Sequence, residues 1–267
     1  IITTEVTAES NAKTVFMFPG QGAQYINMAK ALYENEPVFK TAIDKCISIA
    51  NQHLEVDLYQ VMYPNTGDLY DINQTQWSQI TLFIIEYGLS EYLTHLGVKA
   101  DAYIGHSIGE YVAATLSEVF SLEDAIKIVI SRGQLMQSME SGSMLAIHST
   151  EIDIQEIVKE YHCEIAVINS LENIVVSGSH DKIQSLKTAL ENRGIISIKL
   201  NVSHAYHSVM MEGVLDKFEK VFSDVKLNTP KKKFISNLTG AFATEEVTSA
   251  KYWCNQLRNT VQFAEGI

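Results

Sequence analysis

Apolar residues are distributed in two different patterns in the first 140 residues, and each pattern predicts one kind of element. Apolar residues that recur every three or four positions predict amphipathic helices, whereas short unbroken apolar runs predict strands. Ser121, followed by Glu123 and Asp124, is a predicted helix N-cap, and a loop rich in Tyr, Asn and Asp is expected over 59–74. The pattern predicts strands at 14–18, of the buried type, and 101–104, and helices at 28–54, 76–96, 110–116 and 121–139.

Shorter elements follow from residue 142 onward, in the order β-α-β-β-α-β, which is the ferredoxin-like arrangement. We therefore expect a small ferredoxin-like subdomain over 142–202, inserted into a large α/β subdomain made of 14–141 and 203–267. Residues 1–13 are polar and are predicted to be an N-terminal linker. The expected elements are strands at 144–148, 164–168, 174–177, 195–201 and 234–236, and helices at 152–161, 181–192, 210–222 and around 252–257.

The composition indicates a globular, enzyme-sized chain with a large core: 267 residues, of which 46% are hydrophobic and 19% charged. A net charge of −12 argues against nucleic acid or an anionic membrane as partner. No apolar run reaches 18 residues, and the first residues lack a signal peptide's pattern. Three widely spaced cysteines (Cys46, Cys163 and Cys254) indicate reduced thiols in a cytoplasmic protein. Both ends look cut, so we expect a segment of a longer protein.

The pentapeptide 105–109, Gly-His-Ser-Ile-Gly, lies between a predicted strand and a predicted helix. This is the setting of a nucleophile elbow, in which the serine occupies a tight turn and the glycines remove side chains where strand and helix crowd together. The N-terminus of the following helix favours negative charge near the serine. The pattern predicts Ser107 as a nucleophile on an α/β-hydrolase-like large subdomain with a parallel sheet.

A serine nucleophile needs a neighbouring base, and eight histidines are available. His106 adjoins the serine, but neighbours on an elbow point in different directions, so it is expected to shape the turn. His204 and His207 follow a predicted strand at the point where the chain re-enters the large subdomain. Catalytic groups often lie at such strand ends. Chemistry makes one of these two histidines the base without deciding which.

Four motifs in this order carry a family resemblance: 18–24 (Phe-Pro-Gly-Gln-Gly-Ala-Gln), 105–110 (Gly-His-Ser-Ile-Gly-Glu), 132–137 (Arg-Gly-Gln-Leu-Met-Gln) and 203–208 (Ser-His-Ala-Tyr-His-Ser). Together they resemble the malonyl-CoA:acyl-carrier-protein transacylase family, in particular the acyltransferase domains of modular type I polyketide synthases. The segments 252–253 and 257–263 resemble the end of such a domain. The resemblance covers nearly all of 14–267.

The resemblance implies a role for each residue that matches a motif. Ser107 would accept the acyl group, and His207 would be its general base, oriented by backbone carbonyls within 255–262 and not by a carboxylate. The N–H groups of Gln21 and Ile108 would form the oxyanion hole.

Substrate selection is expected to depend on Arg132, which periodicity alone would place on a solvated helix face. In the family this arginine binds the free carboxylate of malonyl or methylmalonyl, through two parallel hydrogen bonds that a lysine cannot provide. Malonyl-type domains resemble His-Ala-Phe-His where this chain has His204 to His207, and methylmalonyl-type ones Tyr-Ala-Ser-His. Tyr206 keeps the bulk of phenylalanine, which favours malonyl. His106, His204, Gln24 and Gln79 complete the expected substrate-binding set.

The predicted function is the loading of a malonyl unit from malonyl-CoA onto the phosphopantetheine of an acyl carrier protein during polyketide synthesis. No bound cofactor or metal is expected, and neighbouring domains of a multidomain synthase are expected partners. Alternatives are a discrete malonyl transacylase of fatty-acid synthesis, a serine esterase or thioesterase, and a non-catalytic scaffold domain. A hydrolase triad would need an acid between Ser107 and His207, and the best candidates, Asp153 and Asp181, fall in the small subdomain.

Overall fold

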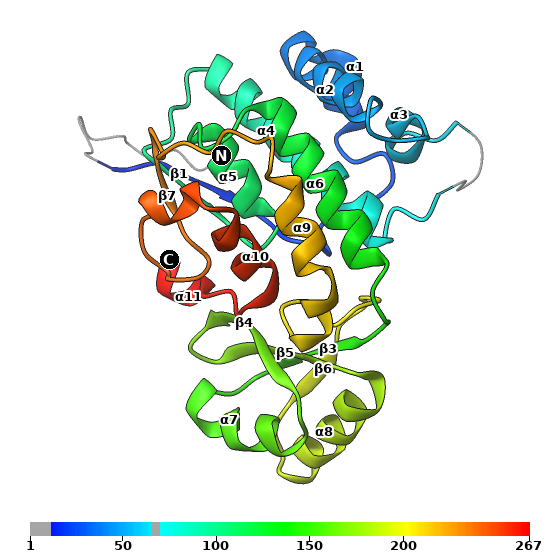
Figure 1. The fold of residues 1–267 in the computed structure, drawn as a ribbon, viewed down its shortest axis with the longest axis vertical. Helices are drawn as coiled ribbons and strands as arrows, with labels where there is room; N and C mark the ends of the chain where they lie inside the picture. The colour runs from blue at the N-terminus through cyan, green and yellow to red at the C-terminus, as the bar shows by residue number, and fades with distance from the viewer. Residues whose placement is uncertain (1–11, 66–69) are drawn as a thin grey trace, which may run out of the picture.

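The computed structural model describes residues 12–65 and 70–267, which form two units that each contain one β-sheet (Figure 1). Most of the predicted linker (1–13) lies outside the described residues. The division at residues 142 and 202 stays a prediction. The elements are β1 (Val15–Phe18), α1 (Lys30–Asn35), α2 (Pro37–Ala50), α3 (Leu58–Met62), α4 (Thr75–His95), β2 (Ala102–Gly105), α5 (Gly109–Leu116), α6 (Leu122–Gln137), β3 (Ser143–Ile147), α7 (Glu151–Glu160), β4 (Glu164–Ser170), β5 (Asn173–Gly178), α8 (His180–Asn192), β6 (Ser197–Lys199), η1 (Val209–Val214), α9 (Leu215–Val221), β7 (Lys233–Ile235), η2 (Glu245–Thr248), α10 (Ala250–Arg258) and α11 (Phe263–Gly266).

The large unit contains a parallel sheet in the order β1-β2-β7, as the predicted α/β fold requires. The central strand β2 is buried along its whole length and leads into the elbow. The prediction of a buried strand at 14–18 is wrong, because β1 lies at the edge of this sheet and leaves Val15 48% and Met17 55% exposed. An apolar run alone does not distinguish an edge strand from a central one.

Helices α4, α5 and α6 supply much of the large core, and α4 packs against both α5 and α6 (Figure 1). The predicted single helix over 28–54 is instead two helices, α1 and α2. Pro37 is the first residue of α2, where its fixed φ is favourable and its missing N–H costs nothing. The predicted loop over 59–74 begins within the short helix α3, whose N-cap Asp57 accepts from the N–H of Tyr59, and residues 66–69 of the loop lie outside the described residues. Ser121 caps α6 as predicted.

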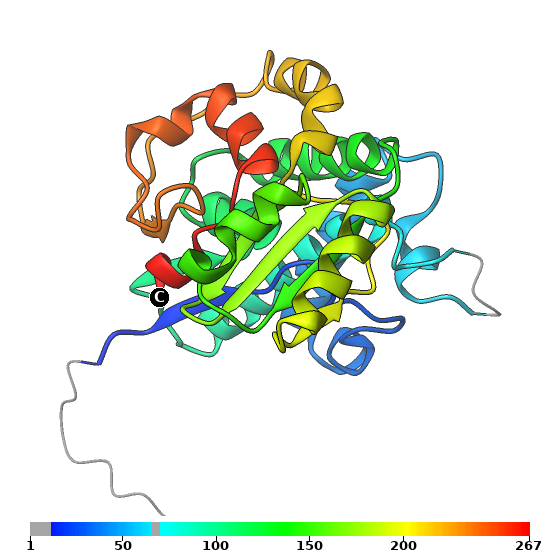
Figure 2. The ribbon, with the colours of Figure 1, turned by 90° about the horizontal axis from the view of Figure 1, so that it is seen from below.

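The small unit contains an antiparallel sheet in the order β4-β5-β3-β6, and this order confirms the ferredoxin-like prediction. Figure 2 shows α7 and α8 lying over one face of this sheet. Alternate residues serve different cores: Leu145 packs under these two helices, whereas its neighbour Met144 joins the core of the large unit. The face opposite α7 and α8 therefore meets the large unit and forms one wall of the space above the elbow.

Among the described residues, no helix is both long and apolar enough to cross a membrane.

Candidate active site

The turn after β2 has the geometry of a nucleophile elbow. Ser107 has φ 53°, a left-handed conformation that costs an ordinary L-residue about 1–2 kcal/mol. A Cβ on Gly105 would lie 2.0 Å from the carbonyl carbon of Gly109, and one on Gly109 would lie 2.4 Å from the backbone oxygen of Phe18. Only glycine fits at these two positions, so the strand and helix can approach closely enough to present the serine hydroxyl.

His207, and not His204, lies against the nucleophile. Its Nε2 is 2.8 Å from Ser107 Oγ, and the side chain is almost fully buried. Burial lowers the pKa of His207 to about 3, and the nearby charge of Arg132 contributes to this lowering. The imidazole is therefore neutral at pH 7 and able to accept the serine proton. His204 is turned away, with its ring nitrogens on Ser203 Oγ and the Met139 carbonyl oxygen.

The second ring nitrogen of His207 has no acid beside it. Within 12–65 and 70–267, Nδ1 has no hydrogen-bond partner. Backbone groups of Gln256 and Asn259 act to raise the pKa of the ring, but neither meets hydrogen-bonding geometry at Nδ1, so the predicted orienting carbonyl is not confirmed. Asp153, a candidate acid for a hydrolase, accepts instead from the Thr150 hydroxyl at the start of α7. A Ser-His dyad, and no carboxylate triad, is present in the described chain.

Arg132 is fully buried on α6 and reaches the nucleophile. Its Nη2 donates to Ser107 Oγ at 3.2 Å and its Nη1 donates to Gln79 Oε1 at 2.6 Å. The expectation of a solvated helix arginine, which periodicity alone gave, is wrong. The guanidinium lies 5.3 Å from the Tyr111 ring centroid, and the buried Glu110 is also close enough to affect its pKa. Burial lowers the pKa of Arg132 from its ordinary value, which means that its charge is held at a cost.

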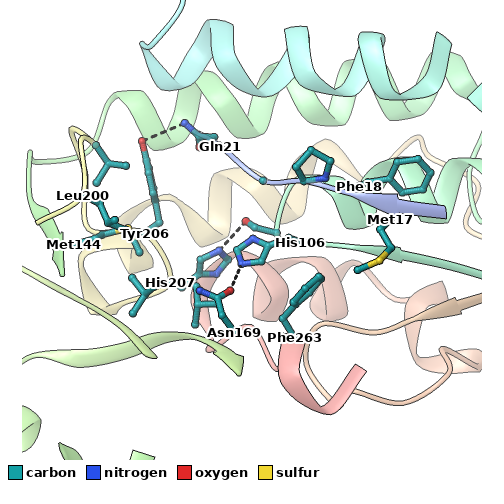
Figure 3. Close-up of a pocket in the computed structure, with 16 residues that line it drawn as sticks. Met17, Phe18, Gln21, His106, Met144, Asn169, Leu200, Tyr206, His207 and Phe263 are labelled. Carbon is teal, nitrogen blue, oxygen red and sulfur yellow. Dashed lines mark hydrogen bonds between the residues drawn. The ribbon is translucent and has the colours of Figure 1, made fainter. Parts of the chain in front are cut away.

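A cavity of about 550 Å³ opens above Ser107 between the two units (Figure 3). Its apolar wall comes from the small sheet and the segment after it (Met144, Val167, Val175, Leu200 and Val202), and the opposite wall from Met17, Phe18 and Phe263. His106 Nε2 is 3.0 Å from Asn169 Oδ1, a contact that joins the elbow to β4 across the cavity. The cavity therefore has mostly apolar walls, with the reactive polar groups at its Ser107 end.

A network of neutral polar side chains surrounds the inner end of this cavity. Gln21 Nε2 donates to Ser78 Oγ at 2.8 Å and to the Tyr206 hydroxyl at 3.4 Å, and Gln21 Oε1 accepts from Gln79 Nε2 at 3.2 Å. The Tyr206 hydroxyl also bonds to Thr75 Oγ1 at the first turn of α4. The extra hydroxyl that distinguishes Tyr206 from phenylalanine therefore fixes the ring in place.

Two backbone N–H groups, of Gln21 and Ile108, were predicted to bind an oxyanion. Both belong to the segments that flank the cavity, since Gln21 lines it and Ile108 directly follows Ser107. Neither N–H donates a hydrogen bond to another group in the described part of the chain. Both donors are thus free for a ligand oxygen.

Gln24 lies away from the other predicted residues. Its Oε1 accepts from the Gly22 N–H and its Nε2 donates to Asn73, beside a separate hollow lined by Tyr25 and Tyr70. The His204 ring stacks on the Tyr206 ring, with 6.1 Å between the ring centroids. Of the predicted site residues, the structure brings together all of the following, but not Gln24: Ser107, His207, Arg132, Gln79, Gln21, Tyr206 and His106.

Sequence reasoning missed two buried amides, Asn237 and Gln256, that contact the elbow directly. Asn237 Oδ1 accepts from the Ser107 N–H, and Gln256 Nε2 donates to the Ser107 carbonyl oxygen. The available signal for Asn237 was its place just after a short strand in the parallel sheet. Asn169, which was also missed, lies at the end of β4 in the antiparallel sheet, where the rule for parallel strands does not apply.

A metal has no obvious site, since no group of three or more His, Cys, Asp or Glu side chains within 12–65 and 70–267 is arranged to hold one. At the serine hydroxyl, a neutral imidazole and a buried guanidinium lie within hydrogen-bonding distance, and the N–H groups of Gln21 and Ile108 donate to no other group in the described chain. This arrangement suits acyl transfer to serine from a substrate that carries a negative charge.

Comparison with known proteins gives matches along almost the whole chain. A sequence profile described as "Acyl transferase domain" matches residues 15–267. A component of the phenolphthiocerol/phthiocerol polyketide synthase of Mycobacterium tuberculosis is 36% identical over 259 residues, which are 97% of this chain and 17% of that protein. The mycoketide-CoA synthase of the same organism is 35% identical over 98% of this chain and 6% of its own length. The chain thus spans less than a fifth of these curated relatives.

Solved structures match as well. The acyltransferase domain from the second module of the salinomycin polyketide synthase is 35% identical with a TM-score of 0.89, over 96% of this chain and 60% of that one. The malonyl CoA-acyl carrier protein transacylase from Clostridium perfringens is 28% identical with a TM-score of 0.84, over 94% of this chain and 80% of that one.

Proposed function

Because this chain belongs to the acyl transferase domain family and is an acyltransferase, we propose that it loads malonyl from malonyl-CoA onto the phosphopantetheine of an acyl carrier protein, as one domain of a polyketide synthase. The observation that carries the proposal is that Ser107 Oγ lies within hydrogen-bonding distance of both a neutral imidazole and a buried guanidinium. A base at the hydroxyl makes it a nucleophile, and the cation supplies a place for the far carboxylate.

The first half-reaction acylates the serine. Ser107 Oγ attacks the thioester carbonyl while its proton moves to His207 Nε2, and the N–H groups of Gln21 and Ile108 stabilise the oxyanion. Loss of one such donor typically costs about 10²–10³ in rate. The C–S bond then breaks, and the proton on His207 passes to the departing CoA sulfur. The malonyl ester remains on Ser107 with its carboxylate on Arg132.

The second half-reaction returns the enzyme to its starting state. The phosphopantetheine thiol attacks the ester, and its proton moves to His207. The tetrahedral intermediate collapses with release of Ser107 Oγ, which takes back that proton. The apolar cavity walls disfavour water, which would otherwise hydrolyse the ester.

Malonyl is the proposed substrate for two reasons. Arg132 is buried with its Nε unpartnered among the described residues, so a neutral acyl group would leave a buried charge poorly compensated, whereas a carboxylate offers two strong acceptors. The Tyr206 ring, fixed by Thr75, limits the room for a substituent at the second carbon. Such steric selection against a methyl group is worth only about 1–3 kcal/mol.

The setting of the domain is proposed from the relatives. Two matched proteins are named as parts of polyketide synthases, and this supports neighbouring synthase domains and a carrier protein as partners. The three cysteines are unpaired and buried, as a cytoplasmic location would permit. A discrete transacylase of fatty-acid synthesis is the second candidate, supported by the likeness to the Clostridium protein.

Intact-mass measurement after mixing with malonyl-CoA tests the proposal. We expect a malonyl adduct that disappears in Ser107→Ala, persists in the control Ser185→Ala on the exposed face of α8, and transfers to a phosphopantetheinylated carrier protein. Release of free malonate faster than transfer would support a hydrolase, and no reaction at all would support a scaffold. Preference for a fatty-acid over a polyketide carrier protein would favour the discrete transacylase.

A further inference from the structure

We propose that Asn237 and Gln256 form an amide clamp that positions Ser107 and aims the neighbouring oxyanion donor. Asn237 Oδ1 accepts from the Ser107 N–H at 2.7 Å, and its Nδ2 donates to the Gly105 carbonyl oxygen at 2.7 Å. Gln256 Nε2 donates to the Ser107 carbonyl oxygen at 2.8 Å. Both side chains are almost fully buried. The inference rests on the proposed role of Ser107 as acyl acceptor.

The clamp reaches three of the four peptide planes between Gly105 and Gly109. Asn237 holds the plane between residues 105 and 106 by its carbonyl, and the plane between 106 and 107 by its N–H. Gln256 holds the plane between Ser107 and Ile108 by the carbonyl. In a trans peptide the C=O and N–H point in opposite directions. Anchoring the Ser107 carbonyl on Gln256 therefore directs the Ile108 N–H to the other side, as an oxyanion donor requires.

Tertiary structure delivers the two amides from distant parts of the chain. The parallel register pairs Ile104 of β2 with Ile235 of β7, so Asn237, two residues further on, arrives beside the elbow. Its own backbone is held in turn, because the Gln262 N–H donates to the Asn237 carbonyl oxygen at 2.7 Å. Gln256 comes from the buried face of α10.

The clamp offsets a local strain. A serine at φ 53° tends to relax toward ordinary backbone geometry, which would move Oγ away from His207 and turn the Ile108 N–H. A displacement of 1 Å at a reacting group can cost about 10²-fold in rate. At the elbow the two amides bond to main-chain atoms of Gly105 and Ser107, and Gln256 also lies close enough to Glu110 to affect the pKa of that carboxyl. Neither amide bonds to an atom expected to bind substrate, so they are positioning residues.

The test compares Asn237→Ala and Gln256→Met with Asn51→Ala as a matched control. Asn51 also braces main chain, since its Oδ1 accepts from the Leu58 N–H, but it lies between α2 and α3. Rapid-quench acylation by malonyl-CoA, followed by mass, gives the acylation rate and the substrate concentration at half-maximal rate. We expect the rate to fall about 10²-fold in either clamp variant, with half-saturation nearly unchanged.

Three results would overturn the clamp: rates close to wild type in folded Asn237 and Gln256 variants, weaker half-saturation with an unchanged maximal rate, or an equal loss in Asn51→Ala. If Asn237→Ala does not fold, Gln256→Met alone decides, because it keeps the length of the side chain. Asn237→Asp, which retains the acceptor for the Ser107 N–H but not the donor to Gly105, should lie between Asn237→Ala and wild type. If wild-type Ser107 takes no malonyl, the proposed function fails instead.

Discussion

Replacing Arg132 with methionine separates the catalytic value of the buried charge from its cost to the fold. Methionine is unbranched and fills much of the same space, so the change removes the charge and its hydrogen bonds more than the packing. Malonyl transfer should fall by about 10²-fold while the free energy of unfolding stays the same or rises. The second effect is expected because burial opposes the charge and Nε has no partner within the described residues, so methionine removes an incompletely compensated buried cation.

The size of the catalytic effect follows from the contacts. Two hydrogen bonds from a guanidinium to a carboxylate contribute about 1.5–3 kcal/mol each. In the free enzyme Arg132 already bonds to Gln79 and Ser107, so binding exchanges these contacts for stronger ones and the net gain falls at the low end. A loss of about 3 kcal/mol corresponds to a decrease of roughly 10²-fold in kcat/KM for malonyl-CoA.

The assay measures kcat/KM for malonyl-CoA and for acetyl-CoA side by side, with thermal unfolding of each protein. The control is Arg193→Met, which removes an exposed positive charge far from Ser107. Acetyl loading should rise relative to malonyl loading in Arg132→Met only. The charge of Arg132 also helps to lower the pKa of His207, so the acid limb of acetyl loading should move to higher pH in this variant. A malonyl-over-acetyl preference unchanged within about twofold would refute the role given to Arg132.

Four further outcomes are expected. Because the pKa of His207 is lowered to about 3, wild-type acylation measured in rapid pH jumps should stay constant through pH 6.5, and a decline centred there would contradict a buried, neutral base. The ordinary pKa of histidine is 6.5, so between pH 6.5 and about 3 the unfolded chain binds a proton at His207 that the folded chain does not. His207 therefore makes the protein less stable as the pH falls through this range, which denaturant titration at several pH values can detect. Burial raises the pKa of Glu110 to about 7, so the folded chain keeps a proton there that the unfolded chain loses above its ordinary value of 4.5. Glu110→Gln should therefore unfold at higher denaturant concentration than wild type at pH 8 but not at pH 4, and equal midpoints at both would exclude the buried carboxyl as a source of instability. Tyr206→Ala should raise methylmalonyl loading relative to malonyl by about tenfold, within the 1–3 kcal/mol of a methyl contact, and competition between the two CoA esters would show an unchanged ratio if the ring does not limit the pocket.

Features of the candidate site that depend on neighbouring residues could be predicted from the sequence. The elbow could be recognised because strand, glycines, serine and helix are contiguous, and their crowding restricts which residues fit. The ferredoxin-like order was readable because its elements are short and follow each other directly. In contrast, two features were missed. Helical periodicity continued across Pro37, although a new helix begins there. The apolar run of β1 did not indicate which neighbouring elements pack on the strand, so its exposed face was not predicted.

The sequence by itself determined the fold class and the nucleophile, and through family motifs it indicated His207 and Arg132. Only the tertiary structure showed that His207, and not His204, contacts Ser107, and that Arg132 is buried beside the same serine. It also showed that Gln24 lies away from the cavity and that Asn237 lies at the elbow. The physical reason is that hydrogen bonds at the site join residues from 25 to 149 positions apart. Periodicity and turn chemistry act over a few residues, whereas these contacts depend on the register of β2 with β7 and on the packing of the small sheet over the large one.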